Sequence, residues 1–432
     1  MATSEPTMTA GVPFAEAAPV AKPRLWNANF YLLWQGQLIS ALGDAVYAIA
    51  LGFWVLNKTG STAVMGTLMA ASSLPRVAIA PFAGVLVDRA DRKWILVAMD
   101  AVRGLAVVLV GVAAFSGQLE VWMVLVAGIV ISLASAFFNP AVGSAMPDLV
   151  PKGSIVQANS AFALLQTGSG VLGNAAGGFL FQLLGAPLMF LANGISYLVA
   201  AAASLPIRVP KVRHETPEFR FFRDLKTGVA FVWQYRGIRN MVLTAAALNF
   251  FAVVGITLFL PLFQRTPGLG SGGYGIVMAA LTGGMFAGFL FTSARKIAYR
   301  RRFSIFFACG IFSMAGAALM PAWLNVPLMA VLGAAFGAAN AVVNSFLSAS
   351  LATAVPQSLR GKVFSFIGTI AGGLTPLAFA AGGALAEVLP LRPLIASAFA
   401  ITLLCFAPLA FSPPTRRLIN FNPEADTLEA IR

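Results

Sequence analysis

The amino-acid sequence predicts an all-α membrane protein whose twelve transmembrane helices form two halves of six helices each. Composition is the first reason: 59% of the 432 residues are hydrophobic and only 10% are charged, whereas about 25% of the residues of a soluble domain are charged. The second reason is that the apolar residues form long runs. A run of about 20 apolar residues spans a bilayer, and it does so as a helix because the backbone must satisfy its own hydrogen bonds.

Six apolar runs precede a charged break and six follow it, and each run predicts one transmembrane helix. The N-terminal bundle, 30–207, contains the runs 30–56, 62–87, 94–116, 121–140, 158–184 and 186–207. The C-terminal bundle, 240–411, contains the runs 240–264, 273–294, 303–323, 326–350, 363–389 and 392–411. Residues 1–24 lack periodicity and the features of a signal peptide. We therefore expect cytoplasmic tails at 1–29 and 412–432.

Lysine and arginine lie almost entirely on one side of this arrangement. The segments expected on that side carry 24 of these residues, whereas the opposite side carries three, Lys58, Arg265 and Arg392. The positive-inside rule places the rich side, with both termini, in the cytoplasm. The net charge of +14 belongs to short loops between apolar runs, so we expect no nucleic-acid partner.

The central cytoplasmic loop, 208–239, separates the two halves and contains a stretch of aromatic and charged residues. This stretch reads Phe219-Arg220-Phe221-Phe222-Arg223-Asp224-Leu225-Lys226. Two interpretations stay open: an amphipathic helix lying on the inner leaflet, or an ordinary linker.

The two halves share a pattern that indicates an internal duplication. Five residues of the first half recur 205 positions later in the second: Asn139, Pro151, Gly168, Gly177 and Gly178 recur as Asn344, Pro356, Gly373, Gly382 and Gly383. Both stretches predict a helix, a short cytoplasmic loop and a glycine-rich helix. A duplicated six-helix unit with both copies in the same orientation is one plan of secondary transporters.

The loop between the second and third helices carries the most specific motif. Its sequence, Gly84-Val85-Leu86-Val87-Asp88-Arg89-Ala90-Asp91-Arg92-Lys93, resembles the cytoplasmic signature G-x-L-x-D-R-x-x-R-K of the major facilitator superfamily. The resemblance implies the major facilitator fold, and it makes Gly84, Asp88, Arg89, Arg92 and Lys93 a cytoplasmic gate. In such a gate the glycine permits close helix approach, while the acid faces a helix terminus and pairs with arginines.

Shorter stretches are similar to the drug-antiporter branch that includes macrolide-efflux and enterobactin-export proteins. They are Ser40-Ala41-Leu42-Gly43-Asp44, Ser73-Leu74-Pro75-Arg76, Asn139-Pro140-Ala141, Leu149-Val150-Pro151 and Gly361-Lys362-Val363-Phe364-Ser365. The resemblance covers roughly residues 26–411. It implies a monomer in the bacterial inner membrane that exports amphipathic small molecules by alternating access. Protons are the expected coupling ion, and no cofactor is expected.

Two segments depart from the family pattern. Gly173-Asn174-Ala175-Ala176-Gly177-Gly178 resembles the antiporter signature G-P-x-x-G-G, but Asn174 stands where proline is usual. Close helix packing by Gly173, Gly177 and Gly178 is the alternative to an antiporter role. Residues 288–302 keep basic residues but lack the acid of the cytoplasmic signature.

Charged residues inside the membrane are the candidates for proton coupling, because they are costly there and usually functional or paired. We expect Asp44 on the first helix to pair with Arg76 on the second, and Asp100 to pair with Arg103 one turn away. Static bridges are the alternative for both pairs. Gln37, Ser40, Asp44 and Tyr47 fall on one helix face, which predicts a polar stripe toward a water-filled cavity. We expect Gln37, Ser40 and Tyr47 to bind substrate there.

The second half offers mainly amides for binding a substrate. The candidates there are Asn249, Asn340 and Asn344, with Asn139 in the first half, and these amides predict a cavity otherwise lined by Phe, Met and small residues. Such a cavity suits a large, mostly apolar substrate. The only acid in the second-half helices is Glu387, near the outer end of the eleventh.

Other functional classes lack the residues that they require. Cys309, Cys405 and the single histidine, His214, form no spacing typical of a metal site, and the sequence has no Walker motif. We expect neither an enzyme nor a metal site. Two alternatives to drug export remain: a transporter for an endogenous siderophore or lysolipid, and a receptor or scaffold that does not transport.

Overall fold

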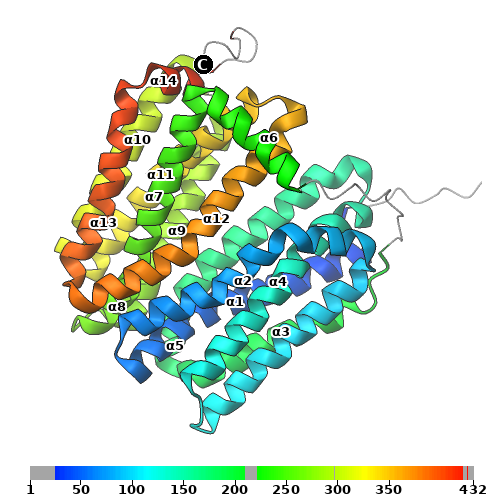
Figure 1. The fold of residues 1–432 in the computed structure, drawn as a ribbon. Coiled ribbons are helices and arrows are strands. Elements are labelled where there is room, and N and C mark those ends of the chain that lie inside the picture. The colour runs from blue at the N-terminus through cyan, green and yellow to red at the C-terminus, as the bar shows by residue number, and fades with distance from the viewer. Residues whose placement is uncertain (1–24, 210–220, 296, 422–425, 427–432) are drawn as a thin grey trace, which may run out of the picture.

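The computed structural model describes residues 25–209, 221–295, 297–421 and 426, and it shows two helical bundles side by side (Figure 1). The bundles correspond to the two halves of the chain. The first contains α1 (Ala28–Thr59), α2 (Thr62–Arg89), α3 (Arg92–Phe115), α4 (Val121–Leu149), the short η1 (Lys152–Ser154) and α5 (Ile155–Ser204).

The second bundle is followed by one short C-terminal helix, α14 (Pro413–Ile419). The bundle itself contains α7 (Arg236–Thr257), α8 (Phe259–Arg265), α9 (Gly270–Ala294), α10 (Tyr299–Leu319), η2 (Met320–Ala322), α11 (Val326–Ala354), α12 (Gln357–Val388), α13 (Leu391–Phe406) and η3 (Ala407–Phe411). Within the described residues, eleven helices are long and apolar enough to cross a membrane.

One of these eleven, α5, accounts for two crossings. It has 50 residues, and at 1.5 Å per residue it would measure about 75 Å, more than twice the thickness of a bilayer core. Gly185 interrupts it with a φ of 70° and a ψ of 171°, and Pro187 follows. The two limbs of α5 therefore match the predicted helices 158–184 and 186–207, so the eleven candidate spans agree with the prediction of twelve helices.

The central loop contains a helix, which is one of its two interpretations, and the expected C-terminal tail contains another. The expected loop 208–239 holds α6 (Phe221–Gln234) and the start of α7. Val232 of α6 is fully buried against the second bundle. The apolar face of α6 therefore packs on that bundle. Phe219 and Arg220 of the aromatic stretch lie outside the described residues. The expected C-terminal tail begins with α14, whose Leu418 and Ile419 are buried in the same core.

The bundles touch at one end, through paired glycines. A side chain on Gly66 of α2 would meet the backbone of Phe379 and Gly383 of α12, and one on Gly178 of α5 would meet the backbone of α9. Gly178 and Gly383 are equivalent positions of the internal repeat, so the two contacts are copies of one design. We call this end, where α1 turns into α2, the closed end.

The opposite end carries most of the lysines and arginines, and there the bundles stand apart. Gly84 lies near this end of α2, while Gly168 and Gly373 lie near the middle of the first limb of α5 and of α12. Nothing lies within 4 Å of where their side chains would be. We call this end the open end.

Candidate functional site

A buried carboxyl group in the first bundle is the centre of the candidate site. Asp44 projects from the middle of α1 toward the second limb of α5. There the Tyr197 hydroxyl donates a hydrogen bond to Asp44 Oδ1, and Asn193 Nδ2 lies 3.4 Å from the same oxygen. Tyr197 and Asn193 are one helical turn apart, so both reach Asp44 from one face of the second limb.

A second carboxyl group and one guanidinium lie beside this pair. Asp100 of α3 is fully buried and accepts a hydrogen bond from Arg103 one turn later, as the sequence predicts. The guanidinium carbon of Arg103 lies 4.6 Å from the ring centroid of Tyr197 and 4.1 Å from that of Phe138. The remaining oxygen of Asp100, Oδ2, has no hydrogen-bond partner. We call Asp44, Asp100, Arg103, Asn193 and Tyr197 the carboxyl cluster.

The predicted pairing of Asp44 with Arg76 is wrong. Arg76 is exposed, its backbone N–H donates to Ser132 Oγ at 3.0 Å, and no ion pair joins it to Asp44 in the described structure. The physical reason is helix packing: α1 packs mainly along α5, whereas α2 packs along α4 and α12. Consecutive helices are not the closest neighbours in this bundle.

The polar stripe on α1 faces protein rather than a water-filled cavity, which corrects the second expectation for this helix. Gln37, Ser40 and Tyr47 are all buried. The Tyr47 ring packs 5.2 Å from that of Phe190 on α5, and its hydroxyl has no partner. Glycines on the same face of α1 let α5 approach closely, because a side chain on Gly43 would meet Asn193 and Ser196.

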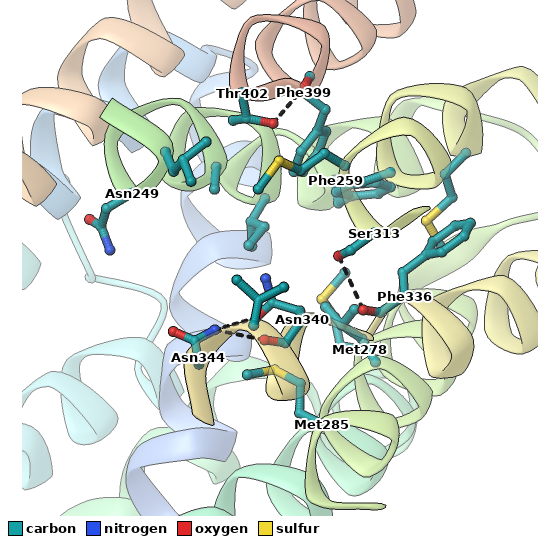
Figure 2. A pocket seen from close by; sticks show the side chains of 18 of the residues that line it. Asn249, Phe259, Met278, Met285, Ser313, Phe336, Asn340, Asn344, Phe399 and Thr402 are labelled. Atoms are coloured by element: carbon teal, nitrogen blue, oxygen red, sulfur yellow. Dashed lines mark hydrogen bonds between the residues drawn. The ribbon is translucent and has the colours of Figure 1, made fainter. Parts of the chain in front are cut away.

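The second bundle contains a separate pocket with a cavity volume of about 310 Å³ (Figure 2). Three amides predicted for substrate binding, Asn249, Asn340 and Asn344, line it. Asn344 Nδ2 donates to the backbone oxygen of Asn340 at 3.0 Å and to its Oδ1 at 2.8 Å. The other lining residues are mostly Met, Phe and small aliphatic side chains, and none is charged. The structure thus brings three of the four predicted amides together.

The fourth amide, Asn139, is exposed on α4 of the first bundle and does not line this pocket. The expected residue types are present, but a cavity of this size is at the small end of ligand pockets, which span about 300–1,000 Å³. The expectation of a large, mostly apolar substrate stays a prediction.

The cytoplasmic signature forms a contact within the first bundle. Arg92 is buried at the start of α3. Its Nη1 lies 2.5 Å from Asp148 Oδ2 and 3.2 Å from the backbone carbonyl oxygen of Ser144, both on α4. Asp91 caps α3 by accepting from the Lys93 backbone N–H at 3.1 Å. Lys93 Nζ lies 5.7 Å from the Trp94 ring, and Arg89 is exposed. The Asp88 side chain lies outside what the structure describes, so its gate role stays a prediction.

The glycines of segment 173–178, which resembles the antiporter signature, pack against neighbouring helices. Side chains on Gly173 and Gly177 would meet Ala45 and Ile49 of α1, and Gly178 contacts α9. The backbone oxygen of Asn174 lies at the same contact with Gly275. This segment of α5 therefore packs on α1 and on the second bundle at once.

Two six-helix bundles that repeat a sequence pattern in the same orientation and pack against each other are the build of a secondary transporter of the major facilitator type. The family comparison agrees. The chain matches the family described as transmembrane secretion effector over residues 18–427, and it belongs to that family.

Characterised relatives are efflux proteins rather than enzymes. The chain is 27% identical to the multidrug efflux pump Tap of Mycobacterium tuberculosis, over 92% of this chain and 96% of that protein. It is 28% identical to macrolide efflux protein A of Streptococcus pyogenes, over 56% of this chain but only 61% of the relative, less than two thirds of its length. A bacterial homologue of the iron transporter ferroportin, solved in an inward-facing state, has the same fold, with a TM-score of 0.66 at 16% identity over 88% of this chain and 97% of that chain.

Sequence reasoning missed three residues that the site uses. Asn193 and Tyr197 lie inside an apolar run, where their spacing of four was the only signal that they share a helix face. Asp148 lies at the end of the fourth run, which continues to Leu149 through Pro140 and Pro147. The predicted helix 121–140 stops short of Asp148, whereas neighbouring helices allow α4 to continue through both prolines.

Proposed function

We propose that this protein is a proton-coupled exporter of amphipathic small molecules that works by alternating access. Membership of a transporter family supports transport, and the names of the two relatives favour drug export. The observation that carries the proposal is that the carboxyl cluster and the pocket lie in different bundles. The buried carboxyl groups of Asp44 and Asp100 lie in the first bundle and the uncharged pocket in the second, so proton and substrate have separate sites that communicate through the rocking of the bundles.

The carboxyl cluster is well placed to act on that rocking. Asp44 lies on α1, and the same helix reaches the second bundle at the closed end, where Gln264 Nε2 hydrogen-bonds Asn57 Oδ1. Tyr197 lies on α5, whose first limb contacts α9. Proton binding or release at Asp44 changes its bonds to the second limb of α5 and so changes the packing of two helices that contact the other bundle.

The pocket supports a substrate that is neutral where it is bound and has large apolar surfaces. Flexible methionines such as Met278, Met285 and Met314 adapt to different shapes. The amides of Asn340 and Asn344 supply polar contacts. A polyanionic siderophore would require cationic partners, and the described lining has none. The volume fits a drug-sized molecule or one part of a larger one.

The open end faces the cytoplasm in this proposal, because it carries most of the lysines and arginines. Substrate enters from that side, and the closed end opens to release it outside. Reporter fusions at the C-terminus and between α9 and α10 are expected to signal from the cytoplasm. A signal from the outer side at either position would contradict the orientation.

The decisive experiment uses inside-out membrane vesicles with an imposed proton gradient, and an uncharged amphipathic dye or a macrolide is added to the medium, which is then on the cytoplasmic side. Asp44→Asn preserves shape and hydrogen bonding but cannot bind and release a proton. We expect it to abolish accumulation against a gradient while dye binding is retained. The exposed Glu120→Gln is the matched control and should transport normally. If Asp44→Asn still accumulates dye with unchanged pH dependence, protons are not coupled through this residue.

A further inference from the structure

Glu387, the only acid in the transmembrane helices of the second bundle, binds the first bundle at the closed end. One oxygen, Oε2, accepts hydrogen bonds from four donors across the interface. They are Ser61 Oγ at 3.1 Å, Thr62 N at 3.1 Å, Thr62 Oγ1 at 3.0 Å and Ala63 N at 3.2 Å. All four lie at the start of α2, although Glu387 is the penultimate residue of α12.

The electrostatics of the helix end explain this contact. The first N–H groups of a helix have no partner inside the helix, and the N-terminus carries a partial positive charge. Ser61 already caps α2 by accepting from Val64 N. Glu387 adds a full negative charge from the other bundle, which satisfies two further N–H groups and the Thr62 hydroxyl.

A basic residue of the second bundle binds the other side of the same turn. Arg265, at the end of α8, donates from Nη2 to the Gly60 oxygen at 2.7 Å. Gly60 is the C-terminal cap of α1, with a φ of 68°, and a helix C-terminus carries a partial negative charge. The acid therefore meets the positive helix end and the base meets the negative one. We call Glu387 and Arg265, with the turn Gly60–Ala63, the end clamp.

We propose that the end clamp is the latch that holds the closed end shut and must release before the transporter opens there. This inference rests on the proposed alternating access. The contacts join the two bundles and belong to neither bundle's core. Glu387 and Arg265 are exposed, so water can solvate both charges once they separate. A contact of this kind is strong enough to favour one state and weak enough to break in each cycle.

The helix geometry supports a role in switching. Helices α2 and α12 run antiparallel along the interface, and each carries an acid as its penultimate residue, Glu387 at the closed end and Asp88 at the open end. Each end of one helix pair thus has its own carboxyl group. In this structure Glu387 is hydrogen-bonded at one end, while at the other end of the pair nothing lies within 4 Å of where a side chain on Gly84 would be.

The test measures the closed end directly with spin labels on purified protein. Cysteines replace the exposed Gln118 and Ala322, which lie at this end on the first and second bundle, in a background lacking Cys309 and Cys405. Wild type should give mainly short distances between the labels. Glu387→Gln keeps the shape of the side chain but removes its charge, and we expect the ratio of open to closed distances to rise about three- to tenfold.

Two further variants and a control separate the latch from a folding defect. Thr62→Val removes a donor from the other bundle, and Arg265→Gln removes the second charge; both should shift the distances in the same direction. Glu120→Gln removes an acid at the same end that pairs with Lys58 within the first bundle, and it should change nothing.

Distances in Glu387→Gln, Thr62→Val and Arg265→Gln that match those of Glu120→Gln would overturn the end clamp. The readout does not depend on transport. A failed clamp therefore leaves the Asp44 experiment standing, and failure of Asp44→Asn to abolish uphill transport leaves the clamp measurement standing.

Discussion

Tyr197 shows how single residues build the carboxyl cluster. Its hydroxyl donates to Asp44 while its ring lies against the guanidinium of Arg103. One side chain from α5 therefore connects an acid on α1 to an ion pair on α3. The cluster contains two carboxyl groups and one guanidinium, and these groups are largely removed from water.

Charge balance predicts that the cluster holds one proton. A buried charge without a counter-charge is costly, and binding one proton makes the cluster neutral. Asp100→Asn leaves Asp44 and Arg103 as a neutral pair, so no proton is needed. We expect the infrared C=O band of a protonated carboxylic acid in the wild type and its loss in both Asp100→Asn and Asp44→Asn.

Asp148→Asn, which removes a carboxylate outside the cluster, serves as the control and should keep the band. Persistence of the band in Asp100→Asn would show that the proton does not depend on the charge count.

At the scale of elements, α11 supplies two of the polar side chains that line the pocket. Asn340 and Asn344 are four residues apart and share one side of the helix, and they hydrogen-bond each other (Figure 2). The internal repeat supplies a matched position, because Asn344 corresponds to Asn139 on α4.

Separate substitutions of Asn344 and of its repeat equivalent Asn139 test whether the pocket selects substrates. Asn344→Leu makes this part of the lining apolar, so we expect efflux of a hydrogen-bonding drug to fall about fivefold relative to an apolar dye, since one lost hydrogen bond costs about 1 kcal/mol. Asn139→Leu should leave the ratio unchanged. Equal effects of the two variants in a drug-resistance assay would place binding outside the pocket.

The start of α3 is held to the end of α4 by Arg92 and Asp148, whose side chains are 8% and 21% exposed. Removing one partner leaves a largely buried charge unpaired. Asp148→Asn is expected to lower the stability of the purified protein by about 2 kcal/mol, measured as thermal or denaturant unfolding. Glu120→Gln breaks an exposed pair (Lys58 and Glu120 are 41% and 53% exposed) and should change little. Equal stability of the two variants would contradict a structural role for Arg92.

At the scale of the whole molecule, backbone contact between the bundles defines the conformation. Gly178→Ala would place a methyl group against the backbone of Ser271 and Gly275, so it should force α5 away from α9 and favour opening of the closed end. Gly168→Ala on the same helix meets open space and should not. Spin-label distances between positions 118 and 322 measure both. Unchanged distances in Gly178→Ala would mean that the contact can relax without separating the bundles.

Much of the fold and part of the site could be predicted from local patterns. Hydrophobic runs located the membrane helices, including the break at Gly185, because the bilayer requires a fixed length of apolar helix. Spacing of three placed Asp100 beside Arg103, and composition indicated a pocket of amides, Met and Phe. The predicted helix end at 140 and helix start at 240 were wrong, since α4 runs to Leu149 and α7 begins at Arg236. Polar residues mark where a helix leaves the hydrocarbon and proline marks where it bends, but neither marks where the helix ends.

The sequence by itself determined the number of helices, the duplication and the basic side, since each depends on residues near one another along the chain. Only the tertiary structure decided that Asp44 contacts Tyr197 rather than Arg76, and that Glu387 caps α2 from the opposite bundle. These contacts depend on which helix surfaces fit together, and hydrophobicity does not encode that choice. The closed end was likewise not predictable, because glycines occur along the length of the interface helices and their positions in the sequence do not show which of them contact the other bundle.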